Sequence, residues 1–177
     1  MKDNVWFTYK ARIYAAQRLS RNDFHSQALL VWYAFFSAAL AVVTVRYPKL
    51  LGSDTDLTAA VLGVGLLVLS MFVTSQDFRG RSIAMRLNYL AMQALHTAMA
   101  QATPTPADIA KYGELLAAVE NHTEMDDKTF RVFHKGQLSR PVTRHQVLEV
   151  YAYLALRAAI LTLLYVAPFV LMLLSTH

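Results

Sequence analysis

The stretch Ala28–Val45, ALLVWYAFFSAALAVVTV, contains no charged side chain. Two other stretches share this property: Leu57–Thr74 (LTAAVLGVGLLVLSMFVT) and Ala158–Leu174 (AAILTLLYVAPFVLMLL). As an α-helix each would be roughly 26 Å long, close to the thickness of the hydrocarbon core of a bilayer. A water-soluble protein of this size could not bury three such helices. The sequence therefore predicts an all-α integral membrane protein.

Composition and charge narrow the class of protein further. Of the 177 residues 55% are hydrophobic and 16% are charged, below the roughly 25% charged content of soluble domains. The absence of cysteine excludes disulfides, thiolate metal sites and cysteine nucleophiles. The formal net charge is +5, but no basic stripe is interleaved with aromatic residues, so direct nucleic-acid binding is not expected.

Basic residues gather on one side of the predicted spans. Positive charge next to a span stays in the cytoplasm, and it also attracts anionic lipid of the bilayer. We therefore expect a cytoplasmic N-terminus, a short outer loop, residues 76–157 in the cytoplasm and the tail Ser175–His177 outside. The residues that set this orientation are Lys2, Lys10, Arg12, Arg18 and Arg21 before the first span, and Arg79, Arg81 and Arg86 after the second.

The chain divides into four predicted parts. Residues 1–26 form an N-terminal amphipathic helix, and residues 27–75 form a two-transmembrane hairpin. Residues 76–143 form a helical cytoplasmic domain, and residues 144–177 form a helix that continues into the third transmembrane span. The link between the first two spans is rich in turn residues, Tyr47-Pro48 and Gly52-Ser53-Asp54.

The first part has apolar residues at spacings of three and four, which places them on one helical face. Arg12 and Arg18 fall on the remaining, polar side. Such a helix lies at the lipid headgroups or packs on the cytoplasmic domain. The apolar face consists of Trp6, Tyr9, Ile13, Ala16 and Leu19.

The third part begins with a helix that continues from the second span, with a weak point at Gly80. The prolines of residues 103–106 end this helix. A second helix is predicted to begin at Pro106, with Thr105 as its N-cap and Asp108 three residues after the cap. The predicted apolar side of the first helix consists of Phe78, Ile83, Leu87, Leu90, Ala94 and Met99.

The remainder of the chain is less regular before it becomes helical again. Residues Met125–Ser139 are predicted to be polar and less regular than the neighbouring helices. Thr143 and Gln146 have the spacing of a capping box, which predicts one helix from about Arg144 through the third span. Pro168 predicts a kink in that helix.

Small and hydroxyl-bearing residues form one stripe on each of the first two spans, at 100° per residue. In an oligomer such stripes line a water path, but the same residue types are enriched at ordinary contacts between membrane helices. The sequence leaves both alternatives open. The pore-lining candidates are Tyr33, Ser37 and Thr44 in the first span and Gly63, Ser70 and Thr74 in the second.

Two polar features lie outside these stripes. Arg157 borders the third span, where it either serves a function in the membrane or extends to the headgroups. Glu120, Asn121 and His122, followed by Asp126, are residue types suited to acid–base chemistry or metal binding. Their spacing matches no metal motif, so we assign no catalytic residue, metal or cofactor. We expect the end of a helix that ties down the following loop, or a contact for a ligand or partner.

Two sequence patterns resemble a known family. The first is Trp6, Tyr9, Arg12 and Arg18 ahead of two closely spaced spans. The second runs from Tyr112 through a leucine pair to Glu120, Asn121, His122 and Asp126. Together they resemble the SLATT superfamily, the two-transmembrane effector domains associated with SMODS and SLOG proteins, and specifically its fifth subfamily.

The resemblance implies a function. Such proteins are expected to be anti-phage or conflict-system effectors in the bacterial inner membrane, which perforate or depolarise that membrane as homo-oligomers and cause cell death or growth arrest. The expected partner is a sensor, a nucleotide signal or a reverse transcriptase encoded nearby. The alternatives are a membrane scaffold that recruits a defence enzyme through the cytoplasmic helices and, less favoured, a membrane enzyme using Glu120, His122 and Asp126.

Overall fold

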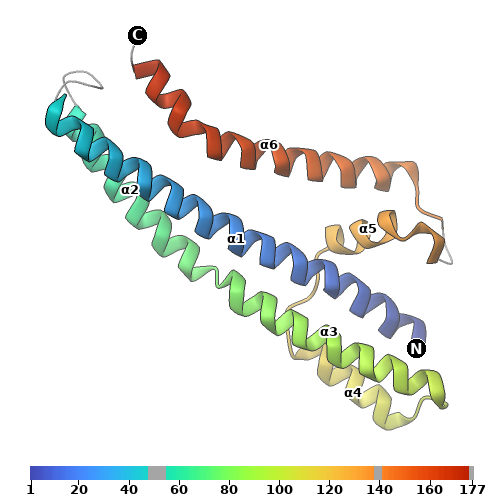
Figure 1. Ribbon diagram of the computed structural model, residues 1–177. Helices are drawn as coiled ribbons and strands as arrows, with labels where there is room; N and C mark the ends of the chain where they lie inside the picture. The colour runs from blue at the N-terminus through green and yellow to red at the C-terminus, as the bar shows by residue number, and fades with distance from the viewer. Residues whose placement is uncertain (48–54, 138–140, 176–177) are drawn as a thin grey trace. The chain divides into compact units, whose positions relative to one another are not determined.

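The computed structural model describes residues 1–47, 55–137 and 141–175 (Figure 1). The turn predicted in the outer loop and the last two residues of the tail lie outside these described residues. The described part of the chain is helical and contains no strand, which confirms the all-α prediction. The elements are α1 (Lys2–Arg46), α2 (Thr55–Ser75), α3 (Phe78–Gln101), α4 (Pro106–Ala117), α5 (Glu124–Phe133), the short 3₁₀ helix η1 (Lys135–Gln137) and α6 (Arg144–Ser175).

The helices form two compact units. The polar unit contains Met1–Asn22 and Phe78–Leu154, and the membrane unit contains Asp23–Asp77 and Ala155–His177. Three helical stretches, one in α1, one that begins in α2 and one in α6, are long and apolar enough to cross a membrane. Almost nothing of their most apolar windows is buried within the chain, which leaves these surfaces to be covered by lipid or by other chains.

Side-chain caps fix where three helices begin. Thr105 accepts a hydrogen bond from the backbone N–H of Asp108 and completes a capping box ahead of α4, as predicted. Thr143 and Gln146 make the predicted reciprocal bonds ahead of α6. A third capping box, between Thr123 and Asp126, starts α5. The prediction of less regular structure over Met125–Ser139 is therefore wrong for α5.

The core of the polar unit lies between α1 and α3. The predicted apolar face of the N-terminal helix packs there, so this helix is held by protein contacts within the unit. Alanines on α1 permit a close approach, and the Ser82 hydroxyl of α3 donates to the carbonyl oxygen of Ala16 at 3.0 Å. The buried apolar residues form two clusters: Val5, Tyr9, Met92, Leu95 and Met99, and Ala15, Ala16, Leu19 and Met85.

Three sequence predictions need correction here. Arg12 is fully buried rather than on a polar surface. The break between the second span and α3 is at Asp77, which has a positive φ of 42°, and Gly80 lies inside α3. The buried face of α3 is the one marked by Met85 and Met92, whereas Ile83, Leu87 and Leu90 of the predicted apolar side are exposed.

Candidate functional site

The residues of the two family-like patterns meet around one segment of the polar unit. This segment, residues 118–123 between α4 and α5, is called the strap. On one side it follows the C-terminus of α4, which packs on α3. On the other side it leads into α5, whose Phe130 contacts the ring of Trp6 on α1 at a centroid distance of 5.4 Å. The strap therefore connects contacts to two helices: α1, which contains the first apolar stretch, and α3, which follows the second.

Arg12 closes the C-terminal end of α4. Its guanidinium donates to the carbonyl oxygens of Leu115 at 3.0 Å and Leu116 at 3.3 Å. These carbonyls belong to the last turn of a helix, where backbone acceptors lack intrahelical donors and a positive charge is stabilised by the helix dipole. Asn88 of α3 accepts from the same guanidinium and donates to the Leu115 oxygen at 2.8 Å. One buried charge thus joins α1, α3 and α4.

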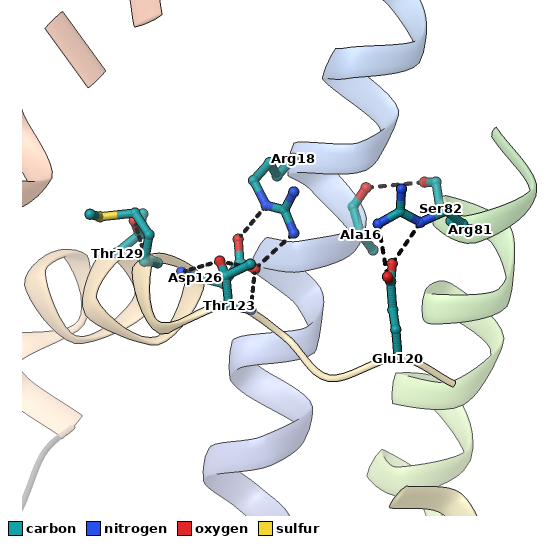
Figure 2. A network of polar contacts seen from close by, with 9 residues as sticks. Ala16, Arg18, Arg81, Ser82, Glu120, Thr123, Asp126 and Thr129 are labelled. Atoms are coloured by element: carbon teal, nitrogen blue, oxygen red, sulfur yellow. Dashed lines mark hydrogen bonds and ion pairs between the residues drawn. The ribbon is translucent and has the colours of Figure 1, made fainter. Parts of the chain in front are cut away.

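Arg18 makes a two-pronged contact with Asp126 at the start of α5 (Figure 2). Its Nε and Nη2 atoms donate to the two carboxylate oxygens at 2.9 and 3.1 Å. Asp126 also accepts from the backbone N–H of Thr123, so the same carboxylate caps the helix. Burial alone would lower the pKa of Arg18, but the hydrogen bond and charge of Asp126 outweigh burial and raise it. Because the carboxylate is buried, its hydrogen bonds to Arg18 and Thr123 offset the cost of taking its charge out of water, and the loss of either partner would be costly.

Arg81 of α3 makes the corresponding contact at the other end of the strap. Its Nε and Nη2 atoms donate to the two carboxylate oxygens of Glu120 at 2.9 and 2.8 Å. Figure 2 shows that Glu120 points to α3 while Asp126 points to α1. Unlike the Arg18 pair, this one is exposed, with 37% and 41% of the side chains accessible. Solvent therefore screens it, and its contribution to stability is small.

The aromatic residues of the patterns support this arrangement. The Tyr112 hydroxyl on α4 lies 2.9 Å from the hydroxyl of Thr8 on α1. Tyr9 is buried in the core, where burial raises its pKa. Trp6 packs partly buried against the same core.

His122 occupies a different environment from the other strap residues. It is half-buried, and its Nδ1 atom is buried without a hydrogen-bond partner among the described residues. Burial lowers its pKa, and the charge of Arg12 lowers it further, whereas Asp127 and Asp126 act in the opposite direction. Asn121, next to it, is exposed.

This geometry limits the chemistry that the cluster can perform as it stands. Glu120 and Asp126 each face a different arginine, and both carboxylates have their oxygens occupied. Within the described ranges no group of three or more His, Asp and Glu side chains is placed to hold a metal ion. The arrangement joins helices, and any ligand of these carboxylates must compete with Arg18 or Arg81.

Sequence reasoning missed three residues of the site: Asn88, Arg81 and Thr123. Asn88 had a detectable signal, because it interrupts the apolar series from Met85 to Met92 and a buried amide needs a partner. Thr123 also had one, since Thr123 and Asp126 repeat the spacing of Thr105 and Asp108. Nothing local marked Arg81, because its partner is 39 residues away.

In the membrane unit the structure separates the pore-lining candidates. Tyr33 of α1 donates its hydroxyl hydrogen to the carbonyl oxygen of Leu164 in α6 at 2.9 Å. Its hydroxyl therefore joins α1 to α6, and the pore-lining role of Tyr33 stays a prediction. The neighbouring Trp32 donates to the carbonyl oxygen of Tyr165 at 3.1 Å. Its ring also contacts Phe169 at a centroid distance of 5.7 Å.

The other candidates make no such link between helices in the contacts described. The hydroxyls of Thr44, Ser70 and Thr74 each donate to a carbonyl of their own helix. Gly63 lies in open space, where an added Cβ would meet no atom within 4 Å. Ser37 and Arg157 are half-buried. The choice between pore lining and helix packing therefore stays a prediction for the stripes of both spans.

Comparison with known proteins finds a family that matches nearly the whole chain. The SMODS and SLOG-associating 2TM effector domain family 5 matches residues 1–174. The chain belongs to this family. The resemblance inferred from the tryptophan–tyrosine–arginine and Glu-Asn-His patterns is thereby confirmed, and the matched region of this SLATT protein includes nearly all of α6. No curated protein and no solved structure matches the chain.

Proposed function

We propose that this SLATT protein is an oligomeric effector of a conflict system directed against phage. On activation it permeabilises or depolarises the bacterial inner membrane, which causes cell death or growth arrest. The observation that carries the proposal is the match of an effector-domain family to residues 1–174, combined with three helices long and apolar enough to span a bilayer. The N-terminus and the polar unit are then cytoplasmic, the side that basic residues next to spans favour.

The strap supplies a route for activation. α1 is one continuous helix from Lys2 to Arg46, and α3 follows α2 after the break at Asp77. A ligand or partner that replaces Arg18 at Asp126, or Arg81 at Glu120, removes a contact between α4–α5 and a helix that leads to a span. Two states of the chain differ in whether these arginine contacts are made or broken. The ligand or partner can shift the equilibrium between them only by the difference between its binding free energies for the two states. The trigger is a nucleotide signal, or a sensor or reverse transcriptase encoded nearby.

The permeation path is formed by several copies, because three helices cannot enclose a wide pore. Ser37, Thr44, Gly63, Ser70 and Thr74 are the residues that face it. Support comes from the open surroundings of Gly63, which leave this face of α2 uncovered within the chain. The hydroxyls of Thr44, Ser70 and Thr74 bond within their own helices, which is compatible with contact with water.

A scaffold that recruits a defence enzyme is the second candidate. The observation that favours it is an apolar surface on α5 and α6 of the polar unit. Phe133, Leu148 and Tyr151 are 49%, 69% and 55% exposed, and the rings of Phe133 and Tyr151 are 6.3 Å apart. Exposed apolar residues that gather in this way often mark a site for another protein.

Membrane potential in cells that express the chain, with and without the neighbouring gene, distinguishes these functions. A voltage-sensitive dye should report rapid depolarisation when the trigger is present. Ser70→Leu should reduce it, whereas Val68→Leu, which places the same side chain on another face of α2, should not. Growth arrest with an intact potential would contradict the effector proposal and favour the scaffold.

A further inference from the structure

Helix α3 carries two apolar faces, of which the chain uses one. The inner face is buried against α1 and α4 and consists of Met85, Asn88, Met92, Leu95 and Met99. The outer face is called the outer seam and consists of Ile83, Leu87, Leu90 and Ala94. The large outer residues are 51%, 64% and 46% exposed in the order Ile83, Leu87, Leu90.

The spacing of the outer seam is that of a coiled coil. Its residues are separated by four, three and four positions, which are the d-to-a and a-to-d steps of a heptad repeat. The positions next to it on one side hold exposed small residues at seven-residue intervals, namely Ala84, Ala91 and Ala98. A seam of this kind buries its apolar side chains when a second helix lies along it.

The hydrocarbon core of a bilayer does not suit the outer seam. Arg79, Arg81 and Arg86 lie within or beside its first half, and Arg81 is bonded to Glu120 of the strap. Arginines at this density are costly in the hydrocarbon region. The seam therefore belongs to the polar unit outside the bilayer core, where an apolar stripe is favoured to meet protein.

The outer seam and its two flanks are complementary to themselves, so a second copy of the same chain fits along the seam. In a parallel pair, the flank that holds Arg79 and Arg86 faces the partner flank that holds Ala84 and Ala91. An antiparallel pair would instead bring the arginines together, and α3 contains no acidic residue to neutralise them.

We propose that the outer seam is a contact between two copies of this chain, with α3 packed in parallel against α3. The contact rests on the proposed function only in taking the chain to act as an oligomer. It places the contact directly after the C-terminal end of α2 in the chain.

Cross-linking tests this contact, because the natural chain contains no cysteine. Ala94→Cys places a thiol on the seam, and Ala110→Cys places one on the exposed surface of α4 as a matched control. In intact membranes a short bismaleimide should join two Ala94→Cys copies and leave Ala110→Cys monomeric. Equal cross-linking of both variants, or none at Ala94→Cys, would overturn the proposal and assign the seam to lipid or another protein.

A charge exchange tests whether the contact is between like helices. Leu87 is exposed, so its substitution leaves the fold of the single chain intact. In the Ala94→Cys background, Leu87→Glu alone and Leu87→Lys alone should each lower cross-linking to the level of Ala110→Cys, because like charges meet. Co-expression of the two should restore it, and failure to do so would contradict the parallel pairing.

The outcome is separable from that of the proposed function. Seam cross-linking without any depolarisation would leave this contact standing and count against membrane permeabilisation. Depolarisation that persists unchanged in Leu87→Glu, without seam cross-links, would count against this contact and leave the effector function standing.

Discussion

The hydroxyl of Tyr33 donates to the carbonyl oxygen of Leu164, four residues before Pro168. This is the one carbonyl that a proline at position 168 deprives of its helical N–H donor. An unpaired carbonyl is costly in hydrocarbon, where no water replaces the lost donor. Tyr33 of the first span thus supplies a donor to the carbonyl that Pro168 leaves unpaired in the third span. The sequence suggested this side chain for a water path, whereas in the structure its hydroxyl joins two helices.

A double-mutant cycle tests this relationship. Tyr33→Phe should lower the free energy of unfolding of the membrane unit by about 1 kcal/mol, because the Leu164 carbonyl loses its donor. In a Pro168→Ala background the restored backbone N–H pairs with that carbonyl, so the same substitution should cost almost nothing. Denaturation in mixed micelles, followed by circular dichroism, measures both values.

Trp32→Phe is the control for this cycle. Trp32 donates to the Tyr165 carbonyl, whose helical donor, the N–H of Phe169, is not removed by the proline. Trp32→Phe should therefore lower the free energy of unfolding by the same amount in the natural chain and in the Pro168→Ala background. An equal cost of Tyr33→Phe in the two backgrounds would mean that the hydroxyl does not serve the proline defect.

The two arginine pairs of the strap should differ in energy despite similar geometry. Asp126 is 4% exposed and Arg18 19%. Because Asp126→Asn removes one partner of this largely buried pair, it should destabilise the polar unit by about 3 kcal/mol. Glu120→Gln at the exposed pair should cost less than about 1 kcal/mol. The chain has two tryptophans, so a Trp32→Phe background leaves Trp6 as the one that fluoresces. Its fluorescence reports the unfolding of the polar unit. Equal losses in the free energy of unfolding for the two variants would show that burial does not set the strength of these ion pairs.

The fold was more predictable from the sequence than the site, for a physical reason. Uncharged stretches, prolines and capping boxes are local signals, so the spans and the starts of α4 and α6 could be read directly. α3 was misjudged because both of its sides are apolar, and the wetter set, Ile83, Leu87 and Leu90, looks as hydrophobic as the buried one. Arg12 was placed on a surface because charge normally stays there, and its acceptors are backbone carbonyls that have no sequence signature.

Arg12 should be the most sensitive residue of the polar unit. Arg12→Met removes the guanidinium donor from the Leu116 and Asn88 oxygens, while Leu115 keeps the Asn88 amide. Since each unpaired oxygen costs about 1–3 kcal/mol, the free energy of unfolding should fall by about 3 kcal/mol. Arg21→Met on the exposed part of the same helix should change it by less than about 0.5 kcal/mol. Chemical denaturation followed by Trp6 fluorescence provides both numbers. A small effect at Arg12 would mean that water replaces it at the end of α4.

His122 should make the polar unit sensitive to mild acid. Burial lowers its pKa, so the folded chain binds a proton at this ring less readily than the unfolded chain, whose histidine titrates near pH 6.5. Stability is then intact above about pH 6.5 and falls as the pH decreases below it, because the unfolded state takes up the proton first. The pKa of His96 is also lowered by burial and adds to the same slope.

The contribution of His122 is isolated by comparing two variants. His122→Gln should flatten the decline of stability between about pH 6.5 and 5, with part of the slope remaining because His96 is still present. His96→Gln should remove the other part, and the double variant should show a flatter profile than either. Denaturant midpoints measured across this pH range give the slopes. A profile for His122→Gln that is as steep as that of the natural chain would mean that the ring is already solvated or protonated in the folded protein.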